Sequence, residues 1–116
     1  TTDHTVVHML METGQITEEE METHPKRHML MKAVGVERTV CPDFFRIDLE
    51  VGQTYRLLLC SDGLSGFCSD AEIQEVLQED VSDTETAQKL IDAALEKGGR
   101  DNISVAIATV SHNTEE

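Results

Sequence analysis

Hydrophobic residues recur along the chain in two periods, and the two periods predict different elements. Helical spacing of three and four residues runs through 6–11, 73–77 and 87–95, whereas 45–49, 55–60 and 103–110 alternate or form short apolar runs. Each spacing places its apolar side chains on one face of a helix or a strand. We therefore expect three strands and three or four helices, which is the α+β class.

Polar residues at the starts of these patterns predict where the helices begin. Asp3, Asp70 and Thr84 precede helical patterns, and their side-chain oxygens can accept hydrogen bonds from the free N–H groups of a first helical turn. A short additional helix is expected to follow Thr17, in a capping box, and to stop before Pro25. Residues 26–34 fit a helix and a strand equally well.

Residues 45–49 are predicted to form a half-buried strand, because apolar and charged residues alternate there. This strand should pair with residues 55–60 as an antiparallel hairpin across the turn at 51–54. Cys60 ends the second apolar run and is expected to be buried as a small hydrophobe. Neither a repeat nor a linker is evident, so residues 1–116 are predicted to be a single domain.

Composition narrows the choice of partners and location. The 116 residues carry a net charge of −14, which would repel nucleic acid and anionic membranes. No apolar run approaches the roughly 20 residues that span a bilayer, and the first residues do not form a secretory signal. Three cysteines, an odd number without metal-finger spacing, favour a reducing setting, and the prediction is a cytoplasmic protein.

Two aspartates at the ends of apolar runs are the strongest candidates for chemistry. Asp62 follows the run at 55–60, and Asp101 precedes the run at 103–110. Carboxylate oxygens at neighbouring strand ends are the ligands that Mg²⁺ and Mn²⁺ prefer. An Asp-Gly turn at Asp62 and a turn cap at Asp101 are the non-functional alternatives.

These residues also lie within motifs that resemble the metal-dependent serine/threonine protein phosphatases of type 2C, or PPM, in their bacterial form. Two of the matching segments are Cys60-Ser61-Asp62-Gly63-Leu64 and Gly98-Gly99-Arg100-Asp101-Asn102. Three more lie at 2–10, 14–20 and 24–35, and resemble T-x-D-H-S-x-V-x-x-L, G-x-I-T-x-E-E and H-P-x-R-N-x-L-T-R-A-L-G. The third of these departs from its pattern at His28, Met31 and Lys32. The resemblance extends to about Val110.

The resemblance implies a fold and a set of roles. The family fold is an α-β-β-α sandwich of two antiparallel sheets flanked by helices. In it, Asp62 and Asp101 would hold one ion of a two-metal Mg²⁺ or Mn²⁺ site, Gly63 would let the backbone pass close to that site, and Asn102 would orient the loop. A metal-activated water would attack phosphoserine or phosphothreonine. Residues 14–35 would form a flap beside the site.

The resemblance covers only the C-terminal half of such a catalytic domain. The other half carries a phosphate-binding arginine and the aspartate that bridges the metals, so the chain alone is expected to be inactive. Its expected partners are a phosphoprotein substrate and the N-terminal half, and its uncovered strands are expected to favour a dimer or a domain swap. A non-catalytic, phosphatase-like binding or regulatory module is the alternative.

Two further patterns are given structural rather than catalytic interpretations. Ser61 precedes Asp62 but belongs to no Ser-His-Asp arrangement, so it is not expected to be a nucleophile. The histidine pairs at positions 4 and 8 and at 24 and 28 are interpreted as surface pairs rather than as a metal site. Substrate-binding residues remain unassigned.

Overall fold

The computed structural model describes residues 1–113. They divide into two compact units, one spanning Thr1–Arg46 and the other beginning at Ile47. The first unit contains α1 (Val6–Glu12) and α2 (Glu18–Thr23). The second contains β1 (Thr54–Cys60), α3 (Asp62–Ser65), α4 (Asp70–Gln78), α5 (Asp83–Glu96) and β2 (Val105–Ser111). The α+β class is confirmed. The assignment of residues 1–116 to a single domain stays a prediction.

The two helices of the first unit begin at threonine caps. The Thr17 hydroxyl accepts a hydrogen bond from the backbone N–H of Glu20 at 3.2 Å, as the capping pattern predicted. The cap of α1 is Thr5, whose hydroxyl accepts from the N–H of His8. The prediction that Asp3 caps this helix is wrong, because its carboxylate accepts from the N–H of Thr5 instead, at 2.8 Å.

Residues 29–31 run antiparallel to the start of α1. The backbone N–H of Val6 donates to the carbonyl of Met29 at 2.9 Å, and that of Met31 donates to the carbonyl of His4 at 2.7 Å. An isolated bridge pairs Leu30 with Thr5 between them. Residues 26–34, for which the sequence left helix and strand open, therefore contain an extended stretch at residues 29–31.

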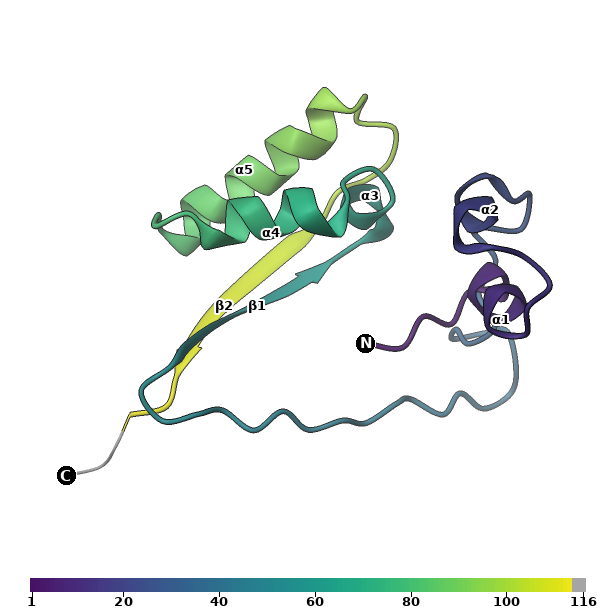
Figure 1. The fold of residues 1–116 in the computed structure, drawn as a ribbon, viewed down its shortest axis with the longest axis horizontal. Coiled ribbons are helices and arrows are strands. Elements are labelled where there is room, and N and C mark those ends of the chain that lie inside the picture. The colour runs from purple at the N-terminus through teal and green to yellow at the C-terminus, as the bar shows by residue number, and fades with distance from the viewer. Residues whose placement is uncertain (114–116) are drawn as a thin grey trace. The chain divides into compact units, whose positions relative to one another are not determined.

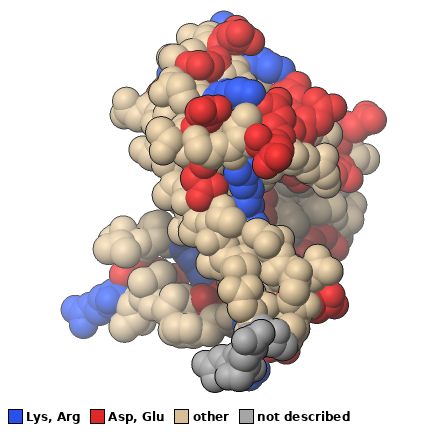
Figure 2. All heavy atoms as spheres, turned by 90° about the vertical axis from the view of Figure 1, so that its left-hand side faces the viewer, with Lys and Arg blue, Asp and Glu red and all other residues tan. Residues whose placement is uncertain are grey.

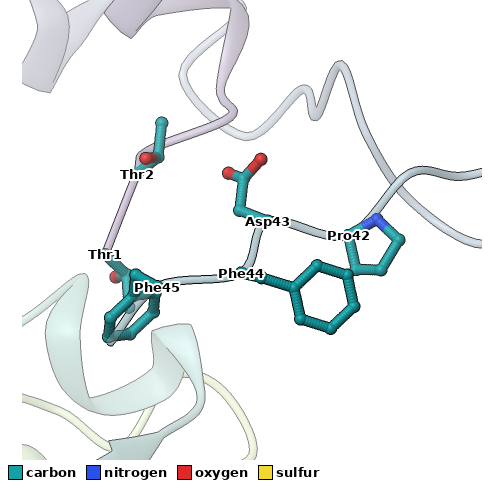
Figure 3. Close-up of a pocket in the computed structure, with 6 residues that line it drawn as sticks. All are labelled: Thr1, Thr2, Pro42, Asp43, Phe44 and Phe45. Carbon is teal, nitrogen blue, oxygen red and sulfur yellow. The ribbon is translucent and has the colours of Figure 1, made fainter. Parts of the chain in front are cut away.

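Asp43 is held by two basic side chains within the same unit. His4 Nε2 lies 2.5 Å from its carboxylate, and Lys32 Nζ lies 3.3 Å away. The hydrogen bond with His4, followed by that with Lys32, holds the pKa of Asp43 below its ordinary value. Asp43 also lines a pocket formed by the first two residues and the extended segment 42–45 (Figure 3). Because both partners already engage the carboxylate, the pocket offers no free charged group from Asp43.

The second unit is a two-stranded antiparallel sheet covered on one face by helices α4 and α5 (Figure 1). The register pairs Thr54 with Ser111 at one end and Cys60 with Val105 at the other. The buried core lies between the sheet and the helices, and consists of Leu64, Cys68, Ile73, Leu90 and Ala94. Leu58, Ile103, Val105 and Ile107 pack against it from the sheet side. This places the apolar stripe of α5 against β2.

The opposite face of the sheet is exposed. Leu57 and Leu59 point away from the helices and are 42% and 67% exposed. Cys60 is exposed as well, so the prediction of a buried thiol is wrong. A strand end has few neighbours, and the apolar run that precedes Cys60 does not reveal this. The expected dimer or domain swap would cover such a face, and it stays a prediction.

The predicted strand at 45–49 and its hairpin with 55–60 are wrong. Residues 41–50 form no strand, and Phe45 and Ile47 are 67% and 62% exposed. Alternation indicates which side chains would share a face, but a strand also needs a neighbour to satisfy its N–H and C=O groups. β1 takes its ladder from β2, far along the chain.

Serines, rather than the predicted residues, cap the two long helices. Ser69 caps α4, and its hydroxyl and the Glu72 carboxylate form a reciprocal capping box. Ser82 caps α5. Asp70 and Thr84 instead lie within the first turns of these helices. The predictions were displaced by one or two residues, because several capping side chains follow one another in each segment.

A largely buried arginine joins β1 to the connection between α4 and α5. The side chain of Arg56 is 20% exposed, and its guanidinium Nε lies 3.4 Å from the carboxylate of Asp83. The other nitrogens donate to the carbonyls of Leu77 (3.0 Å), Glu79 (3.2 Å) and Val81, and to the hydroxyl of the fully buried Thr86 (3.1 Å). Some of these carbonyls lie near the end of α4. The last carbonyls of a helix carry partial negative charge, so a cation beside them stabilises the helix.

Candidate functional site

Asp62 and Asp101 emerge at the same end of the sheet. β1 ends at Cys60, directly opposite Val105, with which β2 begins. Asp62 opens the short helix α3 just after β1, and Asp101 lies in the loop that leads from α5 into β2. The antiparallel register therefore brings together two segments that are far apart in the sequence.

The side chain and backbone of Ser61 connect these two segments. Its hydroxyl donates to the carbonyl of Asn102 at 3.2 Å and accepts from the N–H of Ser104 at 2.9 Å. Its own N–H donates to the carbonyl of Ser104 at 2.9 Å. The pairing of the two strands thus continues past Cys60 up to the residue before Asp62.

Gly63 allows the two segments to approach each other closely. It is buried in α3, and a Cβ atom at this position would lie 2.0 Å from the carbonyl oxygen of Asn102. No ordinary contact is so short, so only glycine fits without a shift of the backbone. The resemblance implied that Gly63 lets the backbone pass close to a metal site, and that role stays a prediction; the structure shows a close approach to the Asn102 carbonyl.

The two carboxylates face solvent. Asp62 and Asp101 are both exposed, and the N–H of Asn102 donates to the Asp101 carboxylate at 2.7 Å. Asn102 contacts Ser61 through its backbone carbonyl rather than through its amide side chain. Arg100 is exposed, and its side chain lies against Gly98 rather than being buried at the site. The roles assigned to Asp62, Asp101, Gly63 and Asn102 therefore stay predictions.

The donor set suits a hard divalent cation but is small. Within residues 1–113 no group of three or more His, Cys, Asp or Glu side chains is placed to hold a metal ion. Two carboxylates with open solvent around them fit Mg²⁺ or Mn²⁺, which keep several waters. By themselves they would make an open and incomplete site rather than a closed one.

The surface charge of the chain favours cations over anions. The formal net charge is −14, and acidic side chains gather in the upper part of the view in Figure 2, with fewer basic ones between them. Such a field raises the local concentration of cations. It also disfavours binding of a phosphate group by this surface without a bound metal.

Sequence reasoning missed a hollow at the paired strand ends and the hydrogen bonds of Ser61. The hollow lies at the end of the sheet and is lined by Leu59, Cys60, Ser61, Ser104, Val105 and Ala106. Its existence depends on the pairing of β1 with β2. The sign of this hollow in the sequence is that polar residues follow the apolar run at 55–60 and precede the apolar run at 103–110.

Comparison with known proteins identifies the homologues of the chain. No family model matches it. The serine/threonine phosphatase stp of Listeria innocua is 40% identical over 107 residues, which cover 92% of this chain and 42% of that protein. A protein from Streptococcus pyogenes described as a putative protein phosphatase of 2C type is 40% identical over 116 residues, which cover 100% of this chain and 45% of that protein.

The fold is shared with solved phosphatases. The catalytic domain of the serine/threonine protein phosphatase PstP, solved with two manganese ions, matches with a TM-score of 0.74 and 37% identity, over 94% of this chain and 43% of that one. The homologues of this chain are thus serine/threonine protein phosphatases of the metal-dependent PPM, or type 2C, family, as the motifs predicted. The chain spans less than half the length of the relatives it matches.

No helix within residues 1–113 combines the length and the apolar composition needed to cross a membrane. The cytoplasmic location stays a prediction.

Proposed function

We propose that this chain contributes one carboxylate pair to the metal centre of a protein serine/threonine phosphatase, with Asp62 and Asp101 as ligands of one Mn²⁺ or Mg²⁺ ion. The observation that carries the proposal is the joining of the two aspartate-bearing segments by Ser61 and by the contact of Gly63 with Asn102. The substrates proposed are phosphoserine and phosphothreonine residues of proteins. Homology to named serine/threonine phosphatases supports this class.

The chemistry of the site follows from its donors. A divalent ion bound there would act as a Lewis acid and would lower the pKa of a bound water. The part of this chain is to fix the ion: two carboxylates supply negative charge and oxygen donors, and the close approach of Gly63 to the Asn102 carbonyl holds their two segments together. The chain alone is proposed to be inactive, because the resemblance implies that the phosphate-binding arginine and the aspartate that bridges the metals belong to the other half of the catalytic domain. The remaining ligands would come from the partner half of the catalytic domain.

The first test is a calorimetric titration of Mn²⁺ into the 116-residue chain, and into the double variant Asp62→Asn/Asp101→Asn. We expect weak binding to the natural chain, with a Kd on the order of 1 mM, the weak end of the range of carboxylate Ca²⁺ sites, where affinity depends on the charge of the ligands and the rigidity of the site. The Asp62→Asn/Asp101→Asn variant should lose this Mn²⁺ binding. The matched control is Asp70→Asn/Asp92→Asn, which removes the same charge from exposed positions on α4 and α5.

Equal loss of binding in both double variants would show that the acidic surface, and not the site, attracts the ion. Binding that is unchanged in the Asp62→Asn/Asp101→Asn variant would contradict the proposed ligands. Phosphatase activity of the pure chain would contradict the proposed need for a partner half. If the chain binds no Mn²⁺ at all, the non-catalytic binding or regulatory module becomes the better hypothesis.

A further inference from the structure

Ser61 occupies a helix-capping position but does not cap the helix. It is the N-terminal cap residue of α3, with an extended backbone (φ −79°, ψ 167°), and its side chain makes no capping hydrogen bond. The serines that precede α4 and α5 do cap their helices. The hydroxyl of Ser61 is instead directed across to the segment that carries Asp101.

Both ends of this bridge lie close to a proposed metal ligand. Ser61 immediately precedes Asp62, and Asn102, whose carbonyl accepts from the Ser61 hydroxyl, immediately follows Asp101. The hydroxyl also accepts from the N–H of Ser104, so it acts as donor and acceptor at once. On the other side of Asp62, Gly63 contacts the same Asn102 carbonyl group.

We infer that Ser61 is a positioning residue, whose hydroxyl fixes the separation of the Asp62 and Asp101 carboxylates and so sets the affinity of the chain for a divalent cation. The inference rests on the proposed function. Both carboxylates are exposed, so packing does not hold them in place. Their separation depends on the backbone of the two turns, and the Ser61 hydroxyl is the side-chain group that ties these turns together.

The proposed role of the Ser61 hydroxyl can be tested with substitutions that remove or keep its hydrogen bonds. Alanine removes the donor and the acceptor together, threonine keeps both, and a cysteine thiol is a weaker donor and acceptor of similar shape. Ser65 provides a matched control, because it is an exposed serine in the same short helix. A role in positioning predicts that threonine rescues what alanine loses.

The experiment combines two measurements on the natural chain and on Ser61→Ala, Ser61→Thr and Ser65→Ala. Amide hydrogen exchange at Ser104, followed by NMR without metal, reports the bridge itself. Calorimetric titration with Mn²⁺ reports the affinity. Loss of one hydrogen bond of ordinary net strength changes an equilibrium by about tenfold. In Ser61→Ala we therefore expect the Ser104 amide hydrogen to exchange about tenfold faster and Mn²⁺ to bind about tenfold more weakly. In Ser61→Thr and Ser65→Ala we expect both quantities to stay close to those of the natural chain.

The outcomes separate this inference from the proposal on which it rests. If the natural chain binds Mn²⁺ and Ser61→Ala binds it equally well, despite faster exchange at Ser104, then Ser61 is purely structural and the inference is overturned while the metal site stands. If the natural chain binds no Mn²⁺, the proposed site fails and the inference fails with it. Should circular dichroism show that Ser61→Ala does not fold, Ser61→Cys takes its place, with a smaller loss expected in both measurements and the same result overturning the inference.

Discussion

Replacement of Arg56 by methionine should destabilise the second unit strongly. Methionine retains an unbranched apolar side chain but none of the donors. The change removes the hydrogen bonds to three carbonyls at the end of α4 and in the connection to α5, the bond to the buried hydroxyl of Thr86, and the ion pair with Asp83.

The structure sets the size of this effect. A hydrogen bond from a charged donor contributes about 1.5–3 kcal/mol when considered singly, but such bonds from one group are not additive. Removal of one partner from a buried ionic network costs about 3–5 kcal/mol. Arg56 is 20% exposed and the carbonyls can recover some water, so we place the loss at the lower end, at about 3 kcal/mol. For a unit of this size, that corresponds to a fall in Tm on the order of 15 °C.

Urea unfolding followed by circular dichroism measures the free energy of unfolding directly. Arg56→Lys should fall between the natural chain and Arg56→Met, because an ammonium keeps the charge but cannot reach all of the acceptors at once. Arg100→Met is the matched control, since Arg100 is exposed, and it should change stability by less than about 0.5 kcal/mol. A loss of under about 1 kcal/mol in Arg56→Met would refute the reasoning, because the network would then contribute no more than one ordinary hydrogen bond.

Three further predictions concern other parts of the chain. Gly63→Ala should cost about 1–3 kcal/mol by overpacking against Asn102 and should weaken Mn²⁺ binding; unchanged unfolding and titration curves would show that the close approach is absent. Ser69→Ala should lower the free energy of unfolding by about 1 kcal/mol through loss of the α4 cap, and urea unfolding that coincides with the natural chain would contradict this. Because the folded-state pKa of Asp43 is depressed, its contribution to stability is present above its unfolded pKa near 4 and is lost as the pH falls through the lower folded value. Acid unfolding of the first unit should therefore be less steep in Asp43→Asn, and identical pH profiles would argue against a role for the pair with His4.

The helices were predictable from the sequence to a large extent, because their signals are local. The stripe that includes Leu90 and Ala94 is buried as its spacing indicated, and Thr17 and Pro25 bound α2 closely. The caps of α4 and α5 were displaced by one or two residues, because neighbouring Ser, Asp and Thr side chains have similar capping ability.

The errors arose where structure depends on partners that are distant in the sequence. Residues 45–49 alternate like a strand, yet β1 pairs with β2. The exposure of Cys60 follows from its place at the end of a two-stranded sheet, and this too depends on the pairing. The two aspartates could be singled out from the sequence, but the hydroxyl bridge from Ser61 could not, because it exists only once that register has formed.

The pairing of Cys60 with Val105 also bears on the order of folding. It closes a long segment of chain that contains α3, α4 and α5. Closure of such a segment is entropically costly and slow compared with the formation of local helices. We therefore expect the helices to form early and the sheet to close late, and the Ser61 bridge lies at the point of closure. The geometry of the two aspartates would then be among the last features to appear during folding, and among the first to disappear when the chain begins to unfold.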